Sequence, residues 1–213
     1  MKYKAILFDM DGTLLDTLTD MASAVNHILS VHGWPLRTTE EVRAFVGNGA
    51  RRLMERAVPP EITGEAFEAV LTEYRDWYQA HNCVDTAPYP GIPALLDALA
   101  AAGVKTAVVS NKPDATTRAL AARFFLGLPA FGQRDDVPPK PAPDLVFRAL
   151  ETLGVETADA AYVGDSEVDV ATARNAGLPL AAVSWGFRGR QALAEAGADT
   201  IADTAEQLLA LLQ

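Results

Sequence analysis

Two aspartates, Asp9 and Asp11, directly follow a short apolar run near the start of the chain, Ala5–Phe8. The run is typical of a buried parallel strand, and positions two apart on an extended chain can point the same way. Two carboxylates held that close repel each other, which indicates a divalent cation. Oxygen ligands favour Mg²⁺, which keeps waters and a substrate phosphate as further ligands. The alternative is an ordinary acidic loop after a strand.

A second polar cluster, Ser110-Asn111-Lys112, follows the segment Val104–Val109, whose pattern predicts another strand. The Ser110 hydroxyl would lie beside the start of a helix expected from Pro113, where it could hold a phosphate oxygen. The alternative is that Ser110 or Asn111 only caps that helix.

A third candidate is Lys140, within the segment Pro138-Pro139-Lys140-Pro141. Prolines this close together make a stiff loop, which would fix the lysine ammonium group in place. A fixed cation can offset the charges of a carboxylate nucleophile and a phosphate together. The alternative is a solvated surface lysine.

A fourth cluster, Gly164-Asp165-Ser166-Glu167-Val168-Asp169, follows the apolar run Ala160–Val163. Asp165 would emerge at the end of a strand, and Asp169 could turn back toward the same place from the first turn of the next helix. Two more carboxylates beside the first pair again require a cation. The alternative, an acidic helix N-terminus favoured by the helix dipole, suits Glu167 better than Asp165.

The elements that position these clusters follow from the hydrophobic pattern. Residues 17 to about 83 show helical spacing only, whereas strands and helices alternate after a Pro/Gly-rich boundary at 87–91. We expect strands at 5–8, 104–109, 160–163, 180–183 and 200–201, a short strand or loop within 131–137, and helices at 92–102, 113–125, 144–153, 168–176, 191–196 and 204–212. This alternation predicts an α/β fold, with a doubly wound, Rossmann-like parallel sheet. Its core comprises residues 1–15 and 88–213, and a helical domain with its linkers, residues 16–87, is inserted. Ligands of such sheets bind beyond the carboxyl ends of the strands, where all four clusters are expected.

The four clusters follow a fixed order along the chain: D-x-D-G-T, a serine after the next strand, a lysine, and G-D-x-x-x-D. Together they resemble the four motifs of the haloacid dehalogenase superfamily, and the resemblance covers the whole core. The resemblance implies that Asp9 is a nucleophile attacking phosphorus and that Asp11 is the acid/base. It implies that Mg²⁺ is held by Asp9, Asp165 and the backbone carbonyl of Asp11, with Asp169 supporting from nearby. Ser110 and Lys140 would bind the transferring phosphoryl group, and Gly12, Thr13 and Asn111 are expected to contact substrate with them.

The resemblance also separates branches of the superfamily. Its dehalogenases lack the aspartate found here at Asp11, and its hexose-phosphate mutases usually replace the threonine found here at Thr13. Its phosphonate-cleaving members use a lysine in the inserted domain, but residues 18–83 contain none. The best remaining interpretation is a phosphatase.

The inserted domain is similar to the caps of this superfamily, which close over the site and select the leaving group. Its segment from Phe45 to Ala57 resembles the cap of bacterial phosphoglycolate phosphatases. We therefore expect Asn48, Gly49 and Arg51 to contact substrate, with Arg51 pairing with a small carboxylate. The alternative for Arg51 and its neighbour Arg52 is a solvated helix face.

The resulting hypothesis is a Mg²⁺-dependent phosphatase for a small phosphate monoester, with 2-phosphoglycolate favoured, acting through an aspartyl-phosphate. A pyrophosphatase, a nucleotidase or a broad sugar phosphatase on the same fold remains open. So does a non-catalytic protein that binds a phosphometabolite, although a pure binder has no need of Asp11.

The composition of the chain limits which partners and which cellular compartment we expect. The 213 residues carry a formal charge of −10, which argues against nucleic acid as a partner. The single cysteine, Cys83, excludes an internal disulfide and favours a reducing compartment. No apolar run is long enough to cross a membrane, and Met1–Lys4 leads straight into the first predicted strand. We expect a cytoplasmic monomer or homodimer. The three histidines have no ligand spacing, and we expect no role for them.

Overall fold

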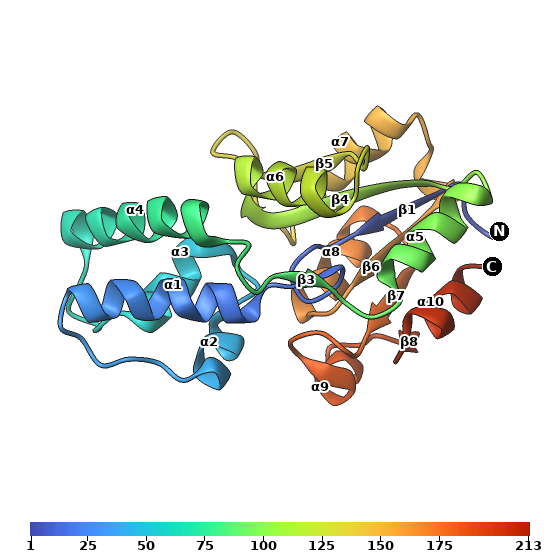
Figure 1. Cartoon of the computed structure of the whole chain (residues 1–213). Helices are drawn as coiled ribbons and strands as arrows, with labels where there is room; N and C mark the ends of the chain where they lie inside the picture. Colours follow the sequence, from blue (N-terminus) through green and yellow to red (C-terminus); the bar gives the residue numbers. More distant parts are fainter. The chain divides into compact units, whose positions relative to one another are not determined.

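The computed structural model describes all 213 residues, and the chain divides into two compact units (Figure 1). The core unit comprises Met1–Asp16 and Pro88–Gln213, and the helical unit comprises Thr17–Ala87. The chain crosses between the units through two short strands, β2 (Leu15–Asp16) and β3 (Ala87–Pro88), which pair with each other. No helix is both long enough and apolar enough to pass through a bilayer.

A six-stranded sheet in the order β5-β4-β1-β6-β7-β8 forms the centre of the core unit, and every pairing in it is parallel. The strands are β1 (Ala5–Phe8), β4 (Lys105–Pro113), β5 (Ala130–Gln133), β6 (Ala160–Gly164), β7 (Leu180–Val183) and β8 (Ile201–Ala202). All four residues of β1 are buried because β4 and β6 flank it and helices cover both faces. The first strand thus ends at the middle of the carboxyl edge.

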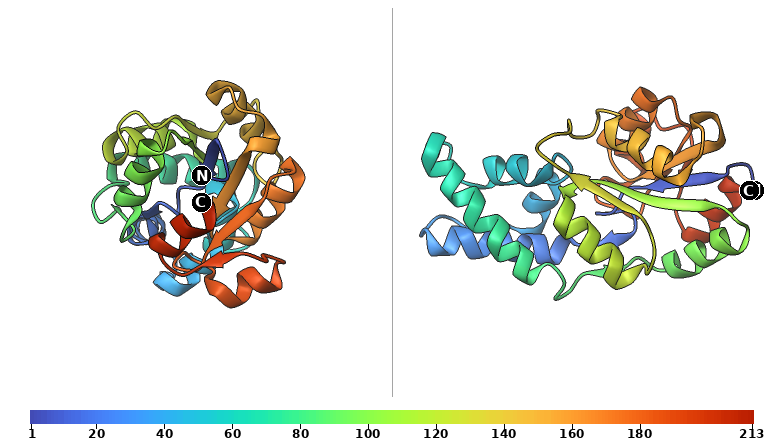
Figure 2. Two further views of the ribbon diagram at one scale, coloured as in Figure 1. Left: turned by 90° about the vertical axis from the view of Figure 1, so that its right-hand side faces the viewer. Right: turned by 90° about the horizontal axis from the view of Figure 1, so that it is seen from above.

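Helices cover both faces of this sheet, as the two views in Figure 2 show. They are α5 (Ile92–Ala101), α6 (Asp114–Phe124), α7 (Asp144–Leu153), α8 (Glu167–Ala176), α9 (Gly189–Glu195) and α10 (Ala205–Leu212), with a short 3₁₀ turn at Thr157–Asp159. On one face, alternate residues of β1, β4 and β6, such as Leu7, Val109 and Tyr162, pack against α7 and α8. This alternation follows from the period of two in a strand.

The helical unit contains four helices: α1 (Leu18–Val31), α2 (Thr39–Phe45), α3 (Gly49–Ala57) and α4 (Gly64–His81). The apolar faces of α1 and α4 pack together and bury Val25, Leu71 and Tyr74. At the start of α2, the Thr38 hydroxyl accepts from the Glu41 N–H while the Glu41 carboxylate accepts from the Thr38 N–H, a reciprocal capping box.

One buried carboxylate ties the end of the helical unit to its beginning. Asp20 lies in the first turn of α1 and accepts hydrogen bonds from the backbone N–H groups of Val84, Asp85 and Thr86, each at 3.0 Å. The Thr86 hydroxyl donates to it as well, at 2.7 Å. The segment that leads into β3 is therefore fastened to the segment that follows β2.

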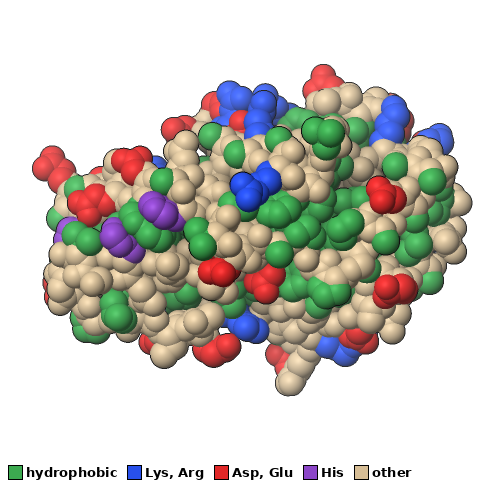
Figure 3. Space-filling view, in the orientation of Figure 1, with side chains coloured by type: hydrophobic (Ala, Val, Ile, Leu, Met, Phe, Trp, Pro, Cys, Tyr) green, Lys and Arg blue, Asp and Glu red, His purple; other side chains and the backbone are tan.

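All three histidines lie on the helical unit, and Figure 3 shows them close together on its surface. His27 and His81 each stack on the ring of Trp77, with ring centroids 4.6 and 4.0 Å away. His32 stacks on Trp34 and pairs with a glutamate on α4. Besides stacking on aromatic rings, His32 and His81 each make a hydrogen bond, with the Glu73 carboxylate and the Trp77 backbone carbonyl respectively.

The predicted fold class is confirmed, including the all-helical insertion between the first strand and the rest of the sheet. One strand boundary was wrong by more than one residue. We predicted that the second long strand ends at Val109, but β4 continues to Pro113, with a shift of its register against β5 between those two residues. The cluster Ser110-Asn111-Lys112 therefore lies within the strand, and α6 begins only at Asp114. Neither Ser110 nor Asn111 caps that helix, whose N-cap is Pro113.

Candidate active site

Asp9 lies just after β1, at the carboxyl edge of the sheet, and its carboxylate is almost fully buried. One oxygen, Oδ1, accepts from the Met10 N–H at 2.7 Å and lies 2.9 Å from Lys140 Nζ. Burial, with the negative charges of Asp169 and Asp11, raises the pKa of Asp9 to about 7, although Lys140 opposes the rise. The ionised form that a nucleophile requires is therefore costly unless further positive charge is added.

Lys140 is a buried cation that contacts Asp9 and Asp169, with only 2% of its side chain exposed. Burial alone would lower its pKa, but the carboxylates of Asp169 and Asp9 raise it well above the usual value, so the ammonium stays charged. Its backbone is held on both sides by the Asn111 amide, at 2.8 and 3.0 Å. Nζ also donates to the Tyr162 hydroxyl at 3.0 Å. The lysine is fixed in place, as the prolines around it predicted.

Asp165 follows β6 and is packed tightly from several sides. It accepts from the Thr13 hydroxyl at 2.9 Å and from the Phe187 N–H at 2.8 Å. A Cβ atom at Gly12 or Gly186 would come within 2.4 Å of an Asp165 oxygen, so both positions require glycine. Burial, followed by the charges of Asp169 and Asp9, raises the pKa of Asp165 well above its usual value.

Asp169 has both carboxylate oxygens engaged inside the protein. Oδ1 lies 2.8 Å from Lys140 Nζ and accepts from the Tyr162 hydroxyl, while Oδ2 accepts from the Ser166 hydroxyl at 2.6 Å. Backbone N–H groups of Asp165 and Ser166 donate to Oδ2 as well. Asp169 therefore holds the lysine and the start of α8, in keeping with a supporting position.

The three buried carboxylates form a group that suits a metal ion. One oxygen from each of Asp9, Asp165 and Asp169 lies within 4.8 Å of the others. All donors in the group are hard oxygens, which is the set that Mg²⁺ selects. The raised pKa values of Asp9 and Asp165 show that the single ammonium of Lys140 does not balance this charge.

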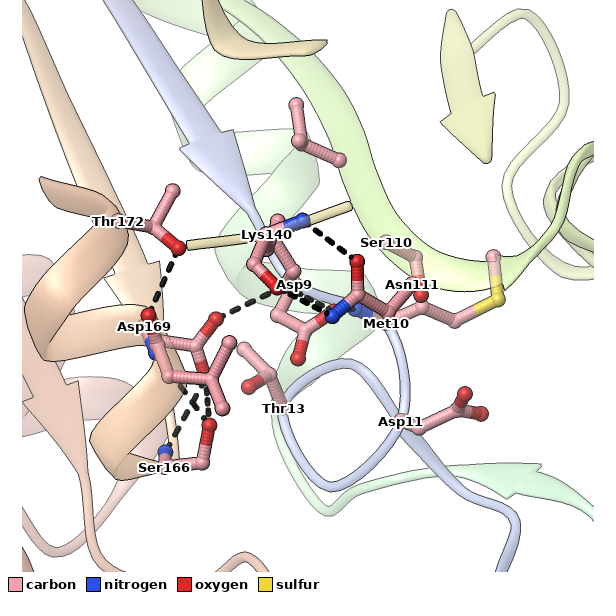
Figure 4. Close-up of polar contacts among 12 residues, drawn as sticks. Asp9, Met10, Asp11, Thr13, Ser110, Asn111, Lys140, Ser166, Asp169 and Thr172 are labelled. Carbon is pink, nitrogen blue, oxygen red and sulfur yellow. Dashed lines mark hydrogen bonds and ion pairs between the residues drawn. The ribbon is translucent and has the colours of Figure 1, made fainter. Parts of the chain in front are cut away.

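Asp11 is oriented differently from the other carboxylates of the site. In Figure 4 its side chain points away from that of Asp9. Both of its oxygens lie beside the ammonium of Lys112, with distances of 2.9 and 3.0 Å to Nζ. The backbone N–H of Lys112 donates at 3.2 Å to the hydroxyl of Ser110, which is buried beside it.

The core unit thus brings together nine of the twelve predicted site residues, and the remaining three lie at the start of α3 in the helical unit. Thr13 donates to Asp165, and Asn111 holds the Lys140 backbone, so both have partners inside the site. Gly12 donates its N–H to Leu15 within the loop. That these residues contact substrate stays a prediction.

In the helical unit, Asn48 is the N-cap residue of α3, and Gly49 begins the helix with a positive φ of 81°. Arg51 lies in the first turn of this helix and makes a bidentate pair with Glu68 of α4, at 2.8 and 2.7 Å. Both side chains are about half exposed, at 47% and 55%. Arg51 therefore has a partner other than a substrate, and its predicted role would require it to leave Glu68.

Sequence reasoning missed three features of the site. Tyr162 lies on β6 inside an apolar run, and its hydroxyl joins Lys140 to Asp169. The loop after β7 closes over Asp165 through Gly186 and Phe187, which no motif marked. Lys112 belongs to the predicted polar cluster with Ser110, but its pairing with Asp11 was not predicted. Alternation along an extended chain places positions 110 and 112 on the same side, which was an available signal.

Comparison with known proteins agrees with this geometry. The family model of the haloacid dehalogenase-like hydrolases matches residues 6–183. The chain is 34% identical to an N-acetylmuramic acid 6-phosphate phosphatase of Pseudomonas aeruginosa, over 100% of this chain and 96% of that protein. It is 36% identical to a phosphoglycolate phosphatase of Cupriavidus necator, over 98% and 92%. A crystal structure from Lactobacillus delbrueckii subsp. bulgaricus, provisionally described as a phosphoglycolate phosphatase, superimposes with a TM-score of 0.94 at 37% identity, covering 100% and 99% of the two chains.

Proposed function

Because the chain belongs to the haloacid dehalogenase-like hydrolases and is a phosphoric monoester hydrolase, we propose that it hydrolyses a small phosphorylated metabolite that carries a carboxylate, with 2-phosphoglycolate as the first candidate. The observation that most strongly supports hydrolysis of a phosphate ester is the buried Asp9, held 2.9 Å from Lys140 at the carboxyl edge of the sheet. A surface carboxylate would need no such cation, whereas a nucleophile facing a phosphate does.

The chain's residues divide a two-step reaction between them. In the first step an Asp9 oxygen bonds to phosphorus, the bond from phosphorus to the leaving oxygen breaks, and the Asp11 carboxyl gives that oxygen its proton. In the second step the Asp11 carboxylate takes a proton from water, and the water oxygen displaces Asp9 from phosphorus. Lys140 and the Ser110 hydroxyl hold the phosphoryl oxygens in both steps.

Asp9 and Asp165, with the backbone carbonyl of Asp11, are the groups that would hold Mg²⁺, and Asp169 orients Lys140 beside them. When bound, Mg²⁺ supplies positive charge that keeps Asp9 ionised and offsets charge on the phosphoryl oxygens. The helical unit acts as the cap in this proposal: it excludes water and selects the leaving group.

The relatives point to two candidate substrates with a common chemistry. Phosphoglycolate is named for one of them and N-acetylmuramic acid 6-phosphate for another. Both molecules carry a carboxylate in addition to a phosphate monoester. The second is therefore the alternative substrate, and it falls within the broad sugar phosphatase that the motifs left open.

Phosphate release from matched substrate pairs tests the proposal. In the presence of Mg²⁺, kcat/KM would be measured for 2-phosphoglycolate against ethyl phosphate, and for N-acetylmuramic acid 6-phosphate against N-acetylglucosamine 6-phosphate. Each pair differs in the group that carries the carboxylate. We expect the carboxylate-bearing member to be preferred in at least one pair. Equal kcat/KM values within both pairs would contradict the proposed recognition of a carboxylate. If none of the esters released phosphate, the phosphatase function itself would be contradicted.

Replacing Arg51 with alanine should reduce kcat/KM for the preferred carboxylate-bearing substrate by at least about tenfold, since a charged pair in a closed site is lost. For p-nitrophenyl phosphate, which carries no carboxylate, the loss should be small. Steady-state kinetics on both substrates checks this expectation.

Arg52→Ala is the matched control, because Arg52 pairs with Glu55 within the same helix at 2.6 Å and should leave both substrates unaffected. Glu68→Gln should lower KM for the carboxylate-bearing substrate, since it releases Arg51 from its bidentate partner. Equal losses on both substrates in Arg51→Ala would mean that the arginine only supports the helical unit.

A further inference from the structure

The contact between Lys112 and Asp11 has no part in the two-step reaction proposed above for Asp9 and Asp11. The Lys112 side chain is only 3% exposed and that of Asp11 14%, so the pair is largely shielded from water. The two residues are 101 positions apart in the sequence, and both carboxylate oxygens lie at hydrogen-bond distance from one ammonium group. An ion pair shielded in this way fixes the position of its members far better than an exposed one does.

The direction in which Asp11 points matters for phosphoryl transfer. In an in-line displacement the entering and leaving oxygens lie on opposite sides of the phosphorus. A carboxyl group that protonates the leaving oxygen must therefore stand apart from the nucleophile. The Asp11 side chain does so, since it points away from Asp9 in Figure 4. Asp9, by contrast, is held against Lys140.

We propose that Lys112 is a positioning residue that holds the Asp11 carboxyl group on the leaving-group side of the site. This inference rests on the proposed function, in which Asp11 is the acid/base. Lys112 also donates its backbone N–H to Ser110, at 3.2 Å. One residue at the end of β4 therefore sets the position of a phosphate-binding hydroxyl through its backbone and of the acid/base through its side chain.

Two phosphate esters with different leaving groups separate this role from others. The alkoxide that leaves an alkyl phosphate needs a proton, whereas 2,4-dinitrophenolate leaves without one. The ratio kcat/KM reports only the steps up to departure of the leaving group, so it isolates the step in which Asp11 acts as an acid. In Lys112→Met, kcat/KM should fall about 10- to 100-fold for the alkyl phosphate. This is a part of the rate enhancement that a general acid usually contributes. For 2,4-dinitrophenyl phosphate it should change less than about threefold.

A double-mutant cycle provides the second measurement. Asp11→Asn removes the acid, so adding Lys112→Met to it should cost little more with the alkyl phosphate. Lys105→Met is the matched control, because it removes the same charge from the exposed start of the same strand. It should leave kcat/KM unchanged for both substrates. Thermal unfolding establishes that each variant is folded. If Lys112→Met fails to fold, Lys112→Gln takes its place with the same expected direction of effect, because its shorter, neutral side chain loses the ion pair to Asp11 but leaves a polar group in the buried site.

Several results would overturn the inference. Equal losses of kcat/KM on both esters would mean that Lys112 binds the phosphoryl group itself. Fully additive losses in the double mutant would mean that it acts independently of Asp11. An unchanged kcat/KM on both esters, with only a lower melting temperature, would leave it a structural residue. Failure of the proposed function looks different, because the unmodified enzyme would then release no phosphate from either ester.

Discussion

Asp9→Asn is expected to lower kcat by at least about 10³-fold on every phosphate ester that the enzyme hydrolyses, because the amide cannot form the bond to phosphorus. The side chain keeps its shape and its place at the end of β1, so the loss should be chemical. Steady-state kinetics measures it. Acid quenching of the wild-type enzyme during turnover should also trap phosphate covalently on the protein, and the variant should trap none. Near-normal kcat in the variant would contradict the covalent mechanism.

The stability of the same variant provides an internal control. At neutral pH the ionised Asp9 is costly, since burial raises its pKa to about 7. Without a metal ion, Asp9→Asn should therefore melt at the same temperature as the wild type or higher, at about pH 8. Asp97→Asn is the matched control for charge removal: this aspartate is exposed on α5 and should alter neither activity nor stability. A large fall in the melting temperature of Asp9→Asn would mean that the activity loss reflects misfolding.

Removing divalent metal with EDTA is expected to lower phosphatase activity by at least about 10²-fold, and added Mg²⁺ should restore it. The reason is the charge balance of the site. Three buried carboxylates face one lysine ammonium, and the pKa values of Asp9 and Asp165 are both raised as a result. Full activity in the chelator would contradict the metal assignment.

The same charge balance predicts how Mg²⁺ affects stability at different pH values. Between the ordinary pKa of an aspartate, near 4, and about 7, the folded protein holds a proton on Asp9 that the unfolded chain has released. This group therefore makes the metal-free protein less stable as pH rises through that window. Mg²⁺ must displace the same proton, so it should raise the melting temperature more at about pH 8 than at about pH 5.5.

Thermal unfolding with and without Mg²⁺ at both pH values checks this, and it needs no substrate. In Asp9→Asn the shift caused by Mg²⁺ should be smaller and should depend less on pH, since one of the titrating ligands is gone. An equal shift at both pH values in the wild type would contradict proton-linked metal binding at Asp9.

Much of the core site could be predicted from sequence because its residues occupy strand ends. Asp9 and Asp165 follow neighbouring parallel strands, and strand ends at one edge of a sheet must come together. Lys140 was predicted to be fixed because of its prolines, although those residues do not reveal what it contacts. The family and the enzyme class predicted from the four motifs are confirmed.

Contacts between distant side chains could not be predicted in the same way. Alternation along the strand places Lys112 on the same side as Ser110, but the sequence does not pair it with Asp11, nor Arg51 with Glu68, because these pairs depend on how the elements pack. The strand end at Val109 was wrong for a related reason: Ser110, Asn111 and Lys112 are polar, and polarity usually marks the end of a strand. Here β4 extends into the buried site, where each of the three residues has a partner.

The fastening of Val84–Thr86 to Asp20 has a consequence for how such enzymes diversify. Because the helical unit closes on itself near its own ends, the core unit only has to supply two adjacent chain crossings, β2 and β3. Between those crossings the inserted segment can change in length and sequence while the sheet and its carboxylates stay as they are. Changes confined to the insertion should therefore alter which substrate is accepted while the hydrolytic core keeps its arrangement.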